Sequence, residues 1–235
     1  MKAEDPRSKN DAIARVGDAE IRVVLHEQLR EHYQDQPEAE ALIIDELGVC
    51  QNQARMDVAV IGDTLDGYEI KSPKDTLARL QRQRDVYNRV FDRLSIVCSK
   101  EHLSDITDII PDWWGVVGVS VDEHNQVSLQ TLRVPGENAG VEGRYLAELL
   151  WREEVLQLLA SYGGDRGFRS QPKRVLWPEL ANRMELDTLK REVRAMLLSR
   201  PDWRGTISAG AAASTPARAG VPRTTRRRRR RRVRR

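Results

Sequence analysis

Apolar positions follow two different spacings along the first 134 residues, which predicts both helices and strands. Residues 10–34 carry apolar side chains at intervals of three and four, the pattern of an amphipathic helix. The same spacing recurs in 73–91 and 101–110. Shorter β-branched runs predict five strands and an edge strand, at 41–47, 56–61, 67–71, 94–98, 115–121 and 127–133. This alternation of helices and strands predicts an α/β protein.

A second region follows the stretch rich in glycine and proline at 135–143, which predicts a boundary. Helical spacing then predicts helices at 144–162, 176–184 and 186–199, packed by Trp151, Trp177 and Trp203. We therefore divide the chain into a core at 1–138, a helical module at 139–204 and a tail at 205–235. A helical appendage is favoured for the module over a winged-helix DNA reader. The module also contains a basic loop suited to phosphate, formed by Arg166, Arg169, Lys173 and Arg174.

Three charged residues lie in the predicted hairpin formed by 56–61 and 67–71. Side chains alternate between the faces of a strand, so Glu69 and Lys71 point the same way, roughly 7 Å apart. Asp57 joins them if odd positions pair with odd positions across the turn. A buried charge is costly unless it is paired or bound to a metal. A solvated face with a surface ion pair is the alternative for these residues.

A helix is predicted directly after this hairpin. Ser72, Pro73 and Asp75 form a helix-start pattern, with a cap, a first-turn proline and an acid three residues after the cap. Gln83 and Tyr87 then fall on the apolar stripe of the helix. A polar side chain there needs a partner, so we expect both residues to face the carboxylates or to form a structural hydrogen bond under the sheet.

The pattern Asp57-x11-Glu69-x-Lys71, followed by Gln83-x3-Tyr87, resembles the PD-(D/E)XK nuclease superfamily and its RecB-like branch. The segments 43–48, 54–59, 67–72 and 111–115 are similar to an uncharacterised bacterial group of that superfamily. This resemblance covers about residues 10–120 and implies a restriction-endonuclease-like αβββαβ core with a mixed central sheet. Met56 departs from the pattern, because proline stands before the aspartate in the motif that names the superfamily.

The resemblance implies a metal-dependent nuclease that hydrolyses phosphodiester bonds, in DNA rather than RNA, and acts in repair or in mobile-element or defence processing. It places Mg²⁺ or Mn²⁺ on Asp57, Glu69 and the carbonyl of Ile70, with Lys71 beside the attacking water. Gln83 and Tyr87 would anchor this catalytic site. A further metal ligand could come from the first helix, through Glu20, or from the first strand, through Glu46; a solvated surface acid is the alternative for each. Arg55 could contact phosphate or form a surface ion pair.

A different class of function also agrees with the sequence. The chain would then be a catalytically silent nucleic-acid-binding or adaptor protein that retains a nuclease-like fold. Two observations separate the alternatives: metal-dependent cleavage of nucleic acid, and thermal stabilisation by Mg²⁺ or Mn²⁺.

The charge is distributed unevenly along the chain. The formal net charge of +3 includes eleven arginines in residues 216–235, so residues 1–215 carry −8. The tail predicts disorder and sequence-independent binding to nucleic acid through Arg226, Arg227, Arg228, Arg229, Arg230, Arg231 and Arg232. A low-complexity end without a selected role is the equal alternative.

Cysteine and apolar content predict a soluble protein of the cytoplasm. Cys50 and Cys98 lack metal-ligand spacing and are too few for a disulfide framework. No apolar run approaches the length that crosses a membrane, so we expect no membrane partner. The sequence pattern selects no oligomeric state.

Overall fold

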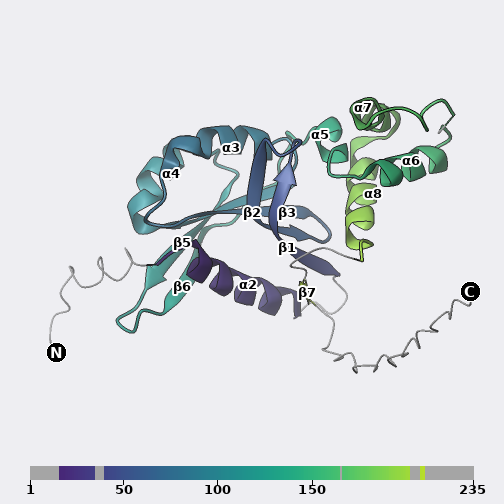
Figure 1. The fold of residues 1–235 in the computed structure, drawn as a ribbon. Coiled ribbons are helices and arrows are strands. Elements are labelled where there is room, and N and C mark those ends of the chain that lie inside the picture. The colour runs from purple at the N-terminus through teal and green to yellow at the C-terminus, as the bar shows by residue number, and fades with distance from the viewer. Residues whose placement is uncertain (1–15, 35–39, 165, 202–206, 210–235) are drawn as a thin grey trace, which may run out of the picture.

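A computed structural model describes residues 16–34, 40–164, 166–201 and 207–209, the last of these by their backbone alone. These residues form a mixed α/β fold (Figure 1). The elements of the first part are α2 (Asp18–Gln34), β1 (Ala41–Val49), β2 (Ala54–Ile61), β3 (Leu65–Lys71), η1 (Leu77–Arg79), α3 (Leu80–Tyr87), β4 (Arg93–Ser99), η2 (Lys100–His102), α4 (Leu103–Ile109), β5 (Gly115–Val121) and β6 (Val127–Arg133). The later elements are α5 (Gly143–Ala147), α6 (Arg152–Ser161), α7 (Lys173–Arg183), α8 (Leu186–Leu198) and β7 (Ile207–Ala209).

Seven strands form one mixed sheet, in the order β6-β5-β4-β3-β2-β1-β7. Strands β1, β2 and β3 are antiparallel neighbours, as short turns permit. The pairs β3–β4 and β4–β5 are parallel, and the crossovers between them contain α3 and α4. The strands at the two ends of the order, β6 and β7, pair antiparallel with β5 and β1.

The two faces of the sheet are covered by different helices (Figure 1). Ile21, Leu25 and Leu29 of α2 pack against one face, together with Val58 and Val60 of β2. Apolar residues of α3 and α4 belong to the cluster on the other face, which also contains residues of α5 to α8. Alternation along β2 produces this division at its end, where Val58 and Val60 face α2 and Ala59 and Ile61 face α3. Met56 also belongs to the α3-side cluster, so the alternation breaks at Asp57.

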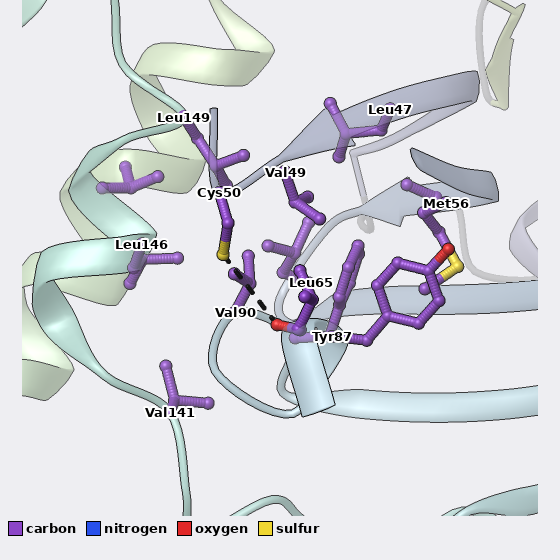
Figure 2. Close-up of a cluster of buried hydrophobic side chains, with 14 of the residues drawn as sticks. Leu47, Val49, Cys50, Met56, Leu65, Tyr87, Val90, Val141, Leu146 and Leu149 are labelled. Atoms are coloured by element: carbon purple, nitrogen blue, oxygen red, sulfur yellow. Dashed lines mark hydrogen bonds between the residues drawn. The ribbon is translucent and has the colours of Figure 1, made fainter. Parts of the chain in front are cut away.

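The later helices join the sheet through this second cluster (Figure 2). Cys50, at the end of β1, lies among Val90, Val141, Leu146 and Leu149, and its thiol contacts the carbonyl oxygen of Val86 at 4.0 Å. Two ion pairs also connect α8 to the segment before β4. Nζ of Lys190 lies 2.8 Å from the carboxylate of Asp92, and Nη1 of Arg194 lies 3.4 Å from it. The division of the chain at residue 138 stays a prediction.

Two predicted helices differ from the observed ones. The helix expected from residue 73 begins at Leu77 with η1, because the N–H and hydroxyl of Ser72 both donate to Asp75 and close a turn first. The single helix expected at 144–162 is divided into α5 and α6. The N–H of Trp151 donates to Glu154 at 2.7 Å, which caps the start of the second helix.

The tryptophans of the helical module also differ from expectation. Trp177 is buried as predicted, but Trp151 is 52% exposed, so its assignment to the core is wrong. Trp203 lies outside the described residues, as do residues 10–15 of the first predicted helix. No helix in the described part of the chain is long and apolar enough to cross a membrane.

Candidate functional site

The hairpin formed by β2 and β3 brings three charged residues, Asp57, Glu69 and Lys71, close together. Ala59 pairs with Gly67 and Ile61 with Leu65, so odd positions oppose odd positions, as the sequence predicted. Glu69 and Lys71 point towards the face of the sheet that α3 covers, because both bond to Gln83 of that helix. Asp57 lies where the alternation of β2 breaks, and Arg22 of α2 lies 3.7 Å from its carboxylate. Glu69 and Lys71 are both buried.

The carboxylate of Glu69 lies at the centre of this cluster and is 1% exposed. Oε1 accepts hydrogen bonds from the ammonium group of Lys71 and from Nε2 of Gln83, the latter at 2.6 Å. Oε2 accepts from the hydroxyl of Tyr87 at 2.8 Å. Both oxygens are thus bound by the chain's own donors, so this buried charge is satisfied within the fold.

Gln83 and Tyr87 reach the cluster from α3. The side-chain oxygen of Gln83 accepts from Lys71 at 3.3 Å, and its amide also lies 3.3 Å from the hydroxyl of Tyr87. The Tyr87 hydroxyl lies 2.7 Å from the carbonyl oxygen of Arg55 as well. Burial, followed by the charge of Glu69, raises the pKa of Tyr87, which keeps the hydroxyl protonated and able to donate.

Asp57 lies at the edge of the cluster and has a perturbed pKa. Its Oδ2 accepts a hydrogen bond from the N–H of Ile70 at 2.7 Å. Burial and the nearby charge of Glu69 raise the pKa of Asp57 to about 7, although the bond from Ile70 favours the ionised form. Ile70 thus contributes its N–H group here, and a role for its carbonyl stays a prediction.

Arg22 of α2 joins four acidic residues beside this cluster, and the sequence interpretation missed it. Its guanidinium lies 3.0 Å from Asp18, 3.3 Å from Asp45 and 2.9 Å from Glu46. It also donates to the carbonyl oxygen of Asp57 at 2.6 Å. The only sequence signal was Asp18, which stands four residues before Arg22 on the same helix.

The remaining candidates occupy more exposed positions. Glu20 is exposed and accepts a hydrogen bond from the N–H of Gly17 at 3.0 Å, at the start of α2. Glu46 pairs with Arg22 and also with Nε of Arg55 at 2.6 Å. Arg55 is therefore in an ion pair, and its role at phosphate stays a prediction. The tail arginines, Arg226 to Arg232, lie outside the described residues.

A cleft of about 380 Å³ opens over the cluster. It is lined by Asp18, Arg22, Glu46, Gln53, Ala54, Arg55, Asp57, Glu69, Ile70, Lys71, Asp75, Arg79, Arg82 and Gln83. Arg79 of η1 and Arg82 of α3 are exposed. No ion pair or hydrogen bond joins either side chain to another residue that the structure describes. The cleft thus contains two kinds of residue: the hydrogen-bonded cluster around Glu69, and the exposed cations Arg79 and Arg82.

The acidic residues of the cleft bond mainly to other groups of the chain. Among the described residues, no group of three or more histidines, cysteines, aspartates and glutamates is arranged to hold a metal ion. The oxygens of Glu69 are engaged by Lys71, Gln83 and Tyr87. Binding of Mg²⁺ or Mn²⁺ at Asp57 and Glu69 stays a prediction.

Comparison with known proteins decides the family. The family model described as "Bacteriophage P4 protein cII" matches residues 14–204, which is most of the chain. The chain belongs to the bacteriophage P4 protein cII family. A curated relative in this family, "Protein cII" of Enterobacteria phage P4, is 25% identical over 181 residues, which cover 77% of this chain and 66% of the phage protein. The chain thus spans slightly less than two thirds of that relative's length. No solved structure matches the chain.

Membership of the cII family overturns the assignment to the PD-(D/E)XK superfamily. The predicted nuclease, its hydrolase activity and its description as a magnesium-dependent deoxyribonuclease are therefore wrong. The motif misled because an acid, a lysine, a glutamine and a tyrosine at this spacing also form a buried hydrogen-bonded cluster. In this cII family chain, the positions of Asp57, Glu69, Lys71, Gln83 and Tyr87 agree with expectation, but their catalytic roles stay predictions.

Proposed function

We propose that this cII family chain is a catalytically silent nucleic-acid-binding protein. The observation that carries the proposal is the state of Glu69, which is buried and bound through both carboxylate oxygens by donors of the chain itself. A carboxylate held in this way stabilises the fold and needs no ligand to compensate its charge.

The scaffold supports the same proposal. The order of the elements from α2 to β4 is helix, three strands, helix, strand, with an antiparallel meander followed by a parallel pair. This order corresponds to the αβββαβ arrangement of a restriction-endonuclease-like core. We therefore propose that the chain uses a nuclease-like scaffold for binding without turnover.

Charge along the chain indicates where nucleic acid would bind. Residues 1–138 contain 16 lysines and arginines and 26 aspartates and glutamates, which gives −10. Residues 139–201 contain 11 basic and 9 acidic residues, which gives +2. The acidic part repels phosphate except where cations gather, and Arg79 and Arg82 at the mouth of the cleft are such a place. The arginines of residues 216–235 supply a second, sequence-independent attraction.

The test is fluorescence anisotropy of the full chain with labelled duplex DNA, single-stranded DNA and RNA over a range of salt. The double variant Arg79→Gln/Arg82→Gln should bind with several-fold lower affinity, and the slope of log K against log salt should fall by about two. Arg144→Gln is the matched control, because it removes an exposed arginine of α5 that lies outside the cleft.

Each outcome of this test has a clear meaning. Equal loss in the double variant and in the control would reject the cleft as the binding site. Absence of binding to every nucleic acid would reject the proposal and leave a protein adaptor. Shortening of a labelled strand during incubation with Mg²⁺, absent in Glu69→Gln, would contradict catalytic silence.

A further inference from the structure

Trp151 presents a large aromatic surface to solvent from a fixed position. It is the N-cap residue of α6 and is 52% exposed. The guanidinium carbon of Arg200 lies 4.3 Å from the centre of its ring system. Arg200 is held in turn by Glu154, at 2.6 and 2.7 Å, and by the carbonyl oxygen of Leu149 at 2.9 Å. A stacked guanidinium therefore orients the indole, which leaves ring surface free for a ligand.

Basic residues occur in three segments that follow Trp151 or contact its neighbours: the start of α6, the loop before α7 and the first turn of α7. Arg152 begins α6, and its guanidinium donates to the carbonyl oxygen of Arg169 in the loop before α7. Trp177 of α7 donates to the carbonyl oxygen of Leu150 at 3.3 Å, which holds α7 beside the segment that leads into α6. The cations of this loop and of the first turn of α7 are Arg166, Arg169, Lys173 and Arg174, all of them exposed.

Three of these cations, Arg166, Lys173 and Arg174, have no ion pair with an acid among the described residues. Glu153 lies 3.8 Å from Arg152, and Glu154 is engaged by Arg200. Arg166 and Arg174 form no ion pair or hydrogen bond with any other part of the chain that the structure describes. Lys173 lies 6.0 Å from the centre of the Trp177 ring and forms no ion pair within that same part. We call Trp151 and these cations, with Arg152, the α6–α7 surface.

We infer that the α6–α7 surface binds single-stranded nucleic acid, with a base stacked on Trp151 and the phosphates on the adjacent cations. An exposed aromatic ring next to a basic segment is the combination that single-strand binding uses, because every base has a face to stack. Duplex bases are already stacked on each other, so the ring selects against a duplex. DNA and RNA share this chemistry. The inference rests on the proposed function and adds a second site and a preferred strand state to it.

The test is anisotropy with labelled dT20, rU20 and a 20-base-pair duplex, using the full chain at about 0.3 M salt, where phosphate attraction is weakened. Trp151→Leu retains apolar area but removes the aromatic face, and should raise the Kd for dT20 or rU20 about tenfold. Trp151→Phe should recover most of that affinity. Tyr162→Leu is the matched control, since Tyr162 is another exposed aromatic residue, just past the opposite end of α6.

The results separate this inference from the proposed function. Stronger loss with dT20 than with rU20 would identify DNA as the ligand, and the reverse would identify RNA. Equal affinities of wild type and Trp151→Leu for both strands would overturn the inference. The proposed function would survive that result if Arg79→Gln/Arg82→Gln still weakened binding. Thermal melting by circular dichroism checks that every variant is folded.

Discussion

The cluster around Glu69 and the α6–α7 surface use similar residues in opposite ways. In the cluster, the buried carboxylate of Glu69 accepts from a lysine, a glutamine and a tyrosine. At the α6–α7 surface, Trp151 is half exposed, and Arg166 and Arg174 have no partner in the part of the chain that is described. The polar groups of the Glu69 cluster bond to each other inside the fold, whereas the side chains of the α6–α7 surface face solvent.

This difference shows which charged residues support the fold and which are available to a ligand. A buried charge is expensive without a partner, so the sequence must supply one, and such a cluster resembles an active site even when it only supports the fold. An exposed cation costs little, and it is available to a ligand when no acid lies beside it. Substitutions in the two regions should therefore change different measured quantities.

The largest effect is expected at Lys71, which is 8% exposed. Lys71→Met retains most of the side-chain volume but leaves the charge of Glu69 without its ammonium partner. The free energy of unfolding should fall by about 3 kcal/mol, measured by urea denaturation. Arg55→Met is the control, because that side chain is 68% exposed and its ion pair with Glu46 contributes about 1 kcal/mol or less. Equal losses in both variants would break the comparison.

A smaller effect on the free energy of unfolding is expected when the pH is changed across the pKa of Asp57. Burial raises this pKa from 3.8 to about 7. The folded state keeps this proton to a higher pH than the unfolded state does. The contribution of Asp57 to stability is therefore complete below about pH 4 and is lost as the pH rises through 7. Relative to Asp57→Asn, the wild type should lose stability over this window by at most about 1.4 kcal/mol per pH unit. Parallel stability profiles would show that Asp57 does not titrate there.

The smallest effect on stability is expected at the α6–α7 surface. Lys173→Gln/Arg174→Gln should change the free energy of unfolding by less than about 0.5 kcal/mol, because neither side chain pairs with an acid among the described residues. The same variant should lower the salt dependence of single-strand binding by about two phosphate contacts. A large loss of stability would show that these cations support the fold, and the contrast with Lys71 would disappear.

Local patterns in the sequence predicted much of the fold and the position of the cluster. Alternation along β3 correctly placed Glu69 and Lys71 on one face, because the side-chain period of a strand is fixed by its backbone. Asp57 lies beside them in the cleft, although the alternation of β2 breaks there. The helical spacing of Gln83 and Tyr87 correctly directed them to the same face. Both predictions depend on neighbours that are close in sequence.

Features that depend on distant neighbours were not predictable in this way. Arg22 reaches Asp45 and Asp57 across the sheet, and no local spacing indicates that contact. Trp151 was expected to pack the helical module, but the break between α5 and α6 leaves it half exposed at the start of α6. The family assignment failed for a related reason: a few residue types at short spacing do not distinguish a catalytic centre from a buried ion pair.

The central claim is that Glu69 supports the fold and takes no part in binding or catalysis. Its most direct test is the variant Glu69→Gln, for which urea unfolding and the Kd for dT20 are measured on the same preparation. We expect a clear loss of stability, since Lys71 becomes a buried ammonium without its carboxylate, and an unchanged Kd under conditions where the variant is folded. A variant that is as stable as the wild type but binds dT20 at least tenfold more weakly would contradict the central claim.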